Sequence, residues 1–306
     1  MKPFNALMIF SPMLHYQSSF VLALLLCLPH HPIGFPQIEI LDDLNRTVSL
    51  PSSAQRIVSL APSITETLFA IAAGNQVVGV TDYCNYPKEA TAQAHVGGII
   101  NPSIETIVSL QPDLIILSME GNVREDFEKL LSFGIPVFVT NPRTLHGIYK
   151  SIEDLGILTD RTEEAAQLVH SMQARQKSVI RAVPKTKKRT LLIVSLQPLI
   201  VVGGGTFLSE LLSIAGAMNL AGSASSTYPM YSRETVIAED PEVLIVMSDV
   251  LADETMLLAQ FPEWEMLAAV RNNQIHRVNS DIVSRPGPRA VDGLERLFHF
   301  LHGRQE

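Results

Sequence analysis

Two glutamates occupy matched positions in an internal repeat. The segment SIETIVSLQPDLIIL begins at Ser103, and SRETVIAEDPEVLIV begins at Ser232. In each copy the serine can cap a helix, and the glutamate, Glu105 or Glu234, falls in its first turn. A carboxylate there stabilises the helix dipole by about 0.3–1 kcal/mol, which is a sufficient structural reason for it. Two equivalent carboxylates can also bind two matched basic patches on a partner with two-fold symmetry.

The usual signatures of catalysis are missing from the sequence. It contains no H-E-x-x-H, G-x-S-x-G or C-x-x-C motif. The glycines of VVGGGTF, which begins at Val201, lack the Lys-Ser/Thr ending of a phosphate-binding loop and indicate a tight strand-to-helix turn. Glu295, His299 and His302 have a spacing that a metal site allows, but no fourth ligand is evident. We therefore expect neither catalytic residues nor a metal site.

Short apolar strands alternate with helical stretches along the chain, and this order predicts parallel sheets covered by helices. The expected strands are residues 56–60, 77–81, 113–117, 136–140, 190–196, 199–202, 242–247 and 274–278. The expected helices are residues 63–74, 103–110, 124–134, 206–216, 232–239 and 288–302, the last with Pro288 in its first turn. The same alternation of strands and helices therefore appears twice.

The length of 306 residues favours more than one domain. We expect an N-terminal lobe over residues 37–145, a linking helical region over residues 146–187 and a C-terminal lobe over residues 188–306. Residues 161–183 predict one long helix, about 35 Å at 1.5 Å per residue. Two lobes joined by such a helix should hinge only slightly.

Composition and the N-terminus indicate an exported protein. The chain is 46% hydrophobic and 18% charged, with a formal charge of −8, which argues against nucleic-acid binding. Residues 18–28 are apolar and follow Lys2, so residues 1–34 are predicted to be a signal peptide or an N-terminal anchor. Lipid attachment at Cys27 stays open. We expect a periplasmic protein, or one tethered to the outer face of the membrane.

Five motifs, in fixed order between Arg56 and His302, resemble those of the periplasmic cobalamin and ferric-siderophore binding proteins of ABC importers. They are RIVSLAPSITETLFAIAAG, VVGVTDYCNYP, VGGIINPSIETIVSLQPDLIIL, YSRETV and RPGPRAVDGLERL. DYCNYP and NPSIE are most similar to the cobalamin branch. The resemblance implies an α/β fold of two Rossmann-like lobes joined by one long helix, with a ligand cleft between them. It also implies a monomer without enzymatic activity or cofactor, whose Glu105 and Glu234 dock onto arginines of the two permease subunits.

Ligands of open α/β sheets bind beyond the carboxyl ends of the strands. Applied to both lobes, this rule predicts ligand-binding residues Ser63, Asp82, Tyr83, Tyr86, Ile100, Gln197, Tyr231 and Arg285. It adds to the walls Pro62, Asn85, Ile99, Met119, Asn141, Leu199, Tyr228 and Asp249. Tyrosines offer flat apolar faces with one polar group, which suits a corrin ring, and Tyr83 and Tyr86 lie in the motif that carries the resemblance.

Two alternatives remain open. Cobalamin binders of this kind often line the cleft with tryptophan, yet the only one here, Trp264, lies in a predicted helix at the edge of the second lobe. Ile99 and Ile100 stand where a tryptophan is expected. A ferric siderophore would fit the same fold and is favoured by Arg285 and Arg143. Heme would also fit it, with Tyr83 as a candidate ligand of the iron. The second alternative is a metallocluster enzyme, which would require clustered cysteines or a nucleophile with its base.

Overall fold

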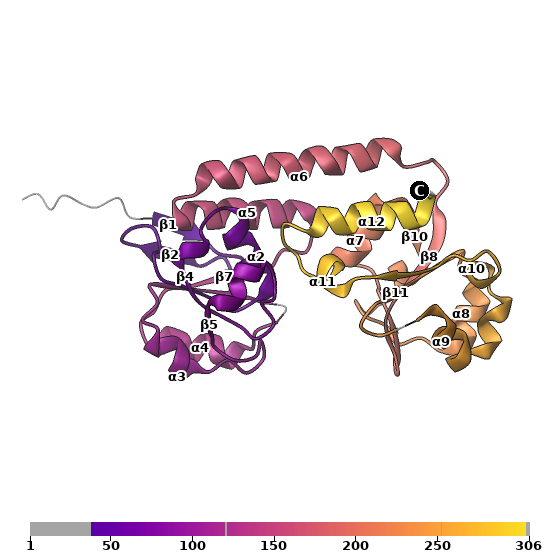
Figure 1. Cartoon of the computed structure of the whole chain (residues 1–306), viewed down its shortest axis with the longest axis horizontal. Coiled ribbons are helices and arrows are strands. Elements are labelled where there is room, and N and C mark those ends of the chain that lie inside the picture. Colours follow the sequence, from indigo (N-terminus) through magenta and orange to yellow (C-terminus); the bar gives the residue numbers. More distant parts are fainter. Residues whose placement is uncertain (1–37, 120, 252, 304–306) are drawn as a thin grey trace, which may run out of the picture. The chain divides into compact units, whose positions relative to one another are not determined.

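The computed structural model describes residues 38–119, 121–251 and 253–303. The predicted signal segment, residues 1–34 with Cys27, lies outside the described residues. Two five-stranded sheets and the helices that cover them make up the described part of the chain (Figure 1). The expected α/β class is therefore confirmed. We call the region of the sheet within residues 57–140 the first lobe and the region of the sheet within residues 188–278 the second lobe.

The sheet of the first lobe is wholly parallel, in the order β5-β4-β3-β6-β7. Its strands are β3 (Ile57–Ser59), β4 (Val77–Val80), β5 (Ala94–His95), β6 (Leu114–Ser118) and β7 (Val137–Thr140). The helices of this lobe are α2 (Pro62–Ala70), α3 (Ile104–Ser109) and α4 (Arg124–Ser132), with short 3-10 turns η1 (Gly74–Gln76) and η2 (Lys88–Ala92). Every residue of β3, β6 and β7 is buried, as expected for strands covered on both faces.

An antiparallel hairpin precedes the first sheet and was not among the predicted elements. It pairs β1 (Ile38–Leu41) with β2 (Thr47–Leu50). The buried carboxylate of Asp42 accepts hydrogen bonds from the backbone N–H groups of Leu44 and Arg46, so it closes the turn. Val48 and Leu50 of β2 alternate inward and pack in the core.

The sheet of the second lobe departs from the expected all-parallel arrangement at one strand. Four parallel strands have the order β10-β8-β11-β12, and β9 pairs antiparallel with β8. Only Gln197 and Pro198 separate β8 from β9. A connection of two residues can reverse the chain but cannot return it to a parallel strand. The strands are β8 (Lys188–Leu196), β9 (Leu199–Val201), β10 (Ala217–Asn219), β11 (Val243–Met247) and β12 (Ile275–Val278).

Short helices complete the second lobe. They are α7 (Phe207–Ile214), α8 (Arg233–Glu239), α9 (Glu254–Gln260), α10 (Ala268–Arg271), α11 (Ser280–Val283) and α12 (Ala290–His302), with 3-10 turns η3 (Leu220–Ser223) and η4 (Pro262–Met266). Helix α12 begins at Ala290, so Pro288 precedes its first turn, which corrects the prediction. The expected position of Trp264 in a helix at the edge of the second lobe is also corrected. Trp264 lies in η4, is fully buried in the core and stacks on Phe261 at 4.2 Å between ring centroids.

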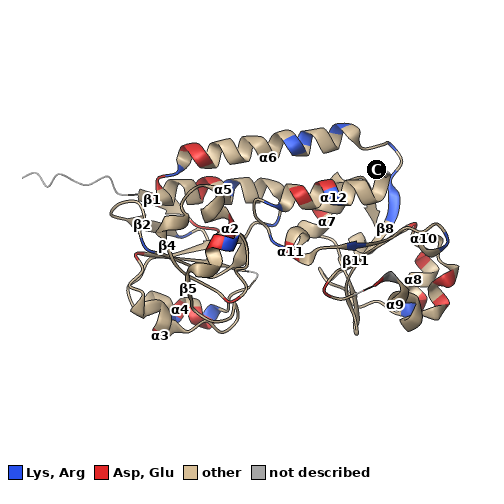
Figure 2. Cartoon of the chain, viewed as in Figure 1, with Lys and Arg blue, Asp and Glu red and all other residues tan. Residues whose placement is uncertain are grey.

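Two helices connect β7 to β8. They are α5 (Leu145–Thr159) and α6 (Thr162–Ala182), and α6 is the long helix that the sequence predicts. Figure 2 shows acidic residues in the first turn of α6 and basic residues towards its end, an order that complements the helix dipole. Helix α12 packs on α6, where Arg175 forms 2.6 Å ion pairs with Asp292 and Glu295.

Candidate ligand-binding site

A hollow of about 280 Å³ lies at the carboxyl edge of the first sheet. Its lining consists of Tyr83, Ile99, Ile100, Asn101 and Gly121, from the segments that follow β4, β5 and β6. Tyr83 is 59% exposed and Ile100 is 69% exposed, so their apolar surface is available to a ligand. The structure therefore brings these two predicted ligand residues together. We call this hollow the Tyr83 hollow.

One side chain joins three loops around the Tyr83 hollow. The amide oxygen of Asn122 accepts a hydrogen bond from Ser118 N at 2.9 Å. Its amide nitrogen donates to Leu60 O at 3.1 Å and to Ile99 O at 2.8 Å. Asn122 thus connects the chain after β3, β5 and β6. Sequence reasoning missed it, because nothing local distinguishes this asparagine from one in an ordinary turn.

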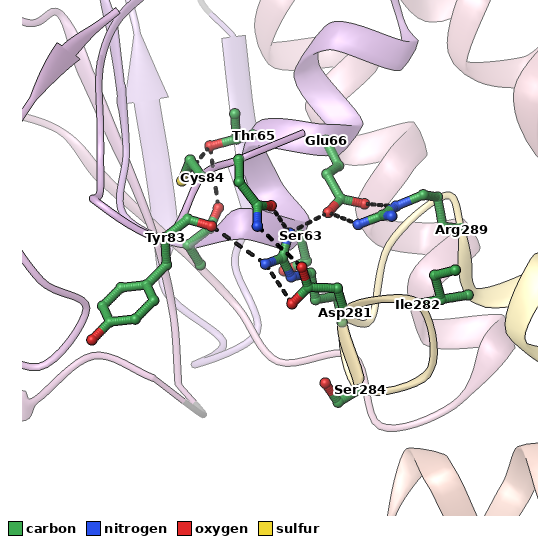
Figure 3. A network of polar contacts seen from close by, with 12 residues as sticks. Ser63, Thr65, Glu66, Tyr83, Cys84, Asp281, Ile282, Ser284 and Arg289 are labelled. Atoms are coloured by element: carbon green, nitrogen blue, oxygen red, sulfur yellow. Dashed lines mark hydrogen bonds and ion pairs between the residues drawn. The ribbon is translucent and has the colours of Figure 1, made fainter. Parts of the chain in front are cut away.

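The segment that carries Tyr83 is anchored on both sides of that residue. Asp82 Oδ1 lies 3.0 Å from His95 Nδ1, and Asp82 N donates to Gly97 O at 2.9 Å. Cys84 is buried, with its sulfur 3.1 Å from Thr65 Oγ1 and 3.2 Å from Thr81 Oγ1. Figure 3 shows the Tyr83 ring directed away from these contacts. Asp82, which the sequence predicts to bind ligand, thus has contacts that hold the segment in place.

Tyr86 lines a different hollow from Tyr83. The guanidinium of Arg289 lies 4.2 Å from the centroid of the Tyr86 ring, a cation–π contact. The second hollow has a volume of about 570 Å³ and is also lined by Glu66, Phe69 and Arg161. Met119, expected in the ligand wall, lines a third hollow of about 370 Å³ with Leu117 and Phe127. The two tyrosines that the sequence pairs are therefore separated by the fold.

A buried carboxylate lies at the centre of an ion-pair cluster. Glu66 of α2 is 2% exposed. Its Oε1 lies 2.9 Å from Arg285 Nη1 and 2.6 Å from Arg289 Nη2, and its Oε2 accepts from Arg289 Nε at 2.8 Å (Figure 3). The hydrogen bonds to Glu66 raise the pKa of Arg289. Arg285 also pairs with Asp281 at 2.7 Å, and its side chain is only 12% exposed.

The chain segments around Ser63 and Gly287 approach each other closely beside this cluster. Ser63, a predicted ligand residue, is 8% exposed at the start of α2. A Cβ atom added to Gly287 would lie 3.2 Å from Ser63 O, tighter than ordinary contact, so the position suits glycine. The sequence motifs that contain Glu66 and Arg289 do not by themselves assign a role to either residue. A charged residue within the apolar stretch TETLFAIAAG is the signal that could have identified Glu66.

Two predicted ligand residues of the second lobe, Gln197 and Tyr231, are not part of the lining of the Tyr83 hollow. Gln197 is exposed in the connection between β8 and β9, and Tyr231 is partly buried. The hydroxyl of Tyr231 donates to Glu239 Oε1 at 3.2 Å. Burial first, and then the charge of Glu239, raise the pKa of Tyr231 to about 12. Neither residue lines the Tyr83 hollow.

The two repeated glutamates lie in matching local structures. Ser103 Oγ accepts from Thr106 N at 3.2 Å, and Ser232 Oγ accepts from Thr235 N at 3.1 Å. Glu105 and Glu234 are exposed in the first turns of α3 and α8. Hydrogen bonds from its own backbone N–H and from Ser232 lower the pKa of Glu234. The predicted helix caps are confirmed, and both carboxylates face solvent.

Comparison with known proteins places this geometry in a family. Residues 57–282 match the family model described as periplasmic binding protein. The chain belongs to the periplasmic binding protein family. It is 32% identical over 249 residues to the vitamin B12-binding protein of Vibrio parahaemolyticus, and this match covers 80% of this chain and 89% of the relative. It is 31% identical to an uncharacterized ABC transporter substrate-binding lipoprotein of Bacillus subtilis, covering 88% of this chain and 86% of the relative.

Solved structures agree with this family membership. The periplasmic vitamin B12 binding protein of Vibrio cholerae matches with a TM-score of 0.74 and 30% identity, covering 82% of this chain and 97% of that one. The periplasmic heme-binding protein of Roseiflexus sp. RS-1 matches with a TM-score of 0.73 and 25% identity, covering 81% of this chain and 97% of that one. In the described part of this chain, no helix has the length and apolarity to span a membrane.

Proposed function

We propose that this protein is an exported, non-enzymatic binding protein that captures cobalamin and delivers it to an ABC importer. The observation that carries the proposal is the similarity to vitamin B12-binding proteins over about four fifths of the chain. The Tyr83 hollow supports it, because it lies at the sheet edge where ligands of such folds bind. Cobalamin is then a cargo, and the protein needs no cofactor of its own.

Ligand recognition would centre on Tyr83 and Ile100. Both side chains are more than half exposed and present apolar surface. A tyrosine ring can pack flat on a corrin while its hydroxyl stays hydrated or binds a polar side group. We place the ligand between the lobes, so that Gln197 and Tyr231 would approach it from the second lobe and Ser63, Asp82, Tyr86 and Arg285 would lie around the entrance.

Delivery would require docking on a membrane permease through Glu105 and Glu234. Both are exposed carboxylates at equivalent helix starts in the two lobes. In Figure 1, α3 and α8 lie on the side of their lobes away from α6. A monomer would bind the two halves of a permease with one glutamate each. The protein would work in the periplasm or tethered to the outer face of the membrane, with tethering through Cys27 as one route.

Calorimetric titration of the purified protein with cyanocobalamin tests the proposal. We expect one-to-one binding with a submicromolar dissociation constant, about −8 kcal/mol or stronger. Parallel titrations with a ferric hydroxamate siderophore and with hemin should give no heat of binding. Binding of either iron compound without binding of cyanocobalamin would refute the cobalamin assignment and retain the class of binding protein.

Heme or a ferric siderophore is the second candidate ligand. The observation that favours it is the position of Trp264, which is fully buried in the core and offers no indole face to a corrin. Tyr83 instead offers an exposed phenol, and tyrosine can ligate heme iron. A solved heme-binding protein shares this fold at 25% identity. An absorbance titration with hemin would reveal iron ligation by tyrosine directly.

A further inference from the structure

The side-chain amide of Asn85 is bound at both ends by residues of the second lobe. Its nitrogen donates to Asp281 Oδ2 at 3.1 Å, and its oxygen accepts from Arg285 Nη1 at 2.8 Å. Arg285 and Asp281 also pair with each other at 2.7 Å. The three side chains therefore form a closed set of contacts, which joins Asn85 to two residues about 200 positions further along the chain. We call this set the Asn85 bridge.

Arg285 has little freedom within the Asn85 bridge. Its Nη1 also lies 2.9 Å from Glu66, which is buried and held from the other side by Arg289. Its Nη2 lies 3.4 Å from the backbone oxygen of Tyr83. The guanidinium is thus committed to protein groups from both lobes, and its side chain is only 12% exposed. This arrangement leaves little of Arg285 for direct contact with a ligand.

Tyr83 is followed directly by two anchors that belong to different lobes. The first is Cys84, which is buried and bound by Thr65 and Thr81 of the first lobe. The second is Asn85, which is held by Asp281 and Arg285 of the second lobe. Figure 3 shows the Tyr83 ring projecting away from Cys84, Thr65 and Asp281. The chain segment that carries the ring is therefore held by contacts from both lobes.

We propose that Asp281 and Arg285 are positioning residues, which hold the segment 82–86 through Asn85 so that Tyr83 is pre-organised for the ligand. The proposal deepens the proposed function and rests on it for the identity of the ligand. Pre-organisation raises affinity because the ordering cost is met before binding. The Asn85 bridge also makes contact of the ligand with Tyr83 depend on the relative position of the lobes.

The first test needs no ligand. We would measure backbone hydrogen–deuterium exchange of the peptide that spans residues 82–87 in Asn85→Ala, Asp281→Ala and the double variant. Both residues lie at the surface, so the fold should persist, and thermal unfolding checks this. Asp292→Ala is the matched control, since it removes another carboxylate–arginine contact of the second lobe that does not touch this segment.

We expect each single variant and the double variant to speed exchange of this peptide by similar factors, because both substitutions break one bridge. The control should leave the rate unchanged. Exchange of residues 82–87 at the wild-type rate in Asp281→Ala would overturn the proposal. So would an equal increase in the Asp292→Ala control.

The second test measures affinity for cyanocobalamin in two backgrounds. Asp281→Ala should weaken binding about tenfold in the wild type and should have no further effect when Tyr83 is already alanine. An equal loss in both backgrounds would show that Asp281 acts independently of Tyr83, against the proposal. If the wild-type protein does not bind cyanocobalamin, the ligand assignment fails while the exchange experiment still decides whether the bridge holds the segment.

Discussion

Substitutions of Tyr83 distinguish most directly between a corrin and heme as the ligand. A corrin would pack on the ring, whereas heme iron would bind the phenolate. We expect Tyr83→Phe to retain cyanocobalamin affinity within about threefold and Tyr83→Ala to lower it about tenfold, since stacking on an aromatic ring is worth about 0.5–1.5 kcal/mol. Calorimetry measures both. A large loss of cyanocobalamin affinity with phenylalanine would contradict packing on the ring, because it would make the hydroxyl the main contact.

Glu66 is the residue whose loss should most affect stability. Its carboxylate is buried and bound by two arginines. Removing one partner of a buried ion pair leaves the other charge uncompensated and costs about 3–5 kcal/mol. We expect Glu66→Gln to lower the free energy of unfolding in urea by about this amount. Glu295→Gln, which alters a pair with Arg175 that is partly open to solvent, should cost less than about 1 kcal/mol.

At the scale of elements, α7 and α5 meet through a titratable group. Glu210 of α7 accepts a 2.6 Å hydrogen bond from Leu145 N at the start of α5. Burial raises the pKa of Glu210 from its ordinary 4.5, the hydrogen bond opposing the shift. A carboxyl whose pKa is raised by folding binds its proton more tightly in the native state. It therefore lowers stability as the pH rises from 4.5 through the folded-state pKa.

Glu210→Gln should remove this dependence while keeping an acceptor for Leu145 N. We expect the free energy of unfolding of the wild type to fall relative to that of the variant as the pH rises through this window. Above it, the difference should stay constant. Urea unfolding at a series of pH values measures the difference, and a relative gain of the wild type with rising pH would contradict the assignment.

The elements show where sequence reasoning succeeds. Long periodic or continuous apolar runs, such as those of α6 and β11, are recognised because their pattern is set by burial alone. The reversal at Gln197 was missed since a strand of three residues carries no signal of direction. The hairpin of β1 and β2 was missed because its turn depends on the Asp42 carboxylate rather than on glycine.

Less of the candidate site could be predicted from the sequence, because much of it depends on contacts between distant segments. The rule for sheet edges gathered Tyr83 and Ile100 correctly, because strand ends are local features. It could not separate Tyr83 from Tyr86, since three residues of loop can direct two rings into different hollows. Contacts between residues far apart in sequence, such as Glu66 with Arg285, need the tertiary structure.

At the scale of the whole molecule, the repeated glutamates give a test of delivery. Glu105→Arg combined with Glu234→Arg should abolish stimulation of the transporter ATPase by the loaded protein, because each change replaces attraction by repulsion at a basic permease surface. Affinity for the ligand should be unchanged, since neither residue lines the Tyr83 hollow. Glu163→Arg on α6 is the matched control. Full stimulation by the double variant would assign both glutamates to helix capping alone.

The ion-pair cluster around Glu66 also bears on how this protein can recombine with its relatives. A chimera that takes its first half from one parent and its second half from another separates Glu66 and Asn85 from Asp281, Arg285 and Arg289. Each parent supplies only half of the charges that compensate one another. Functional hybrids should therefore be those that inherit residues 62–86 and 280–289 together, so that specificity is exchanged by grafting loops rather than whole lobes.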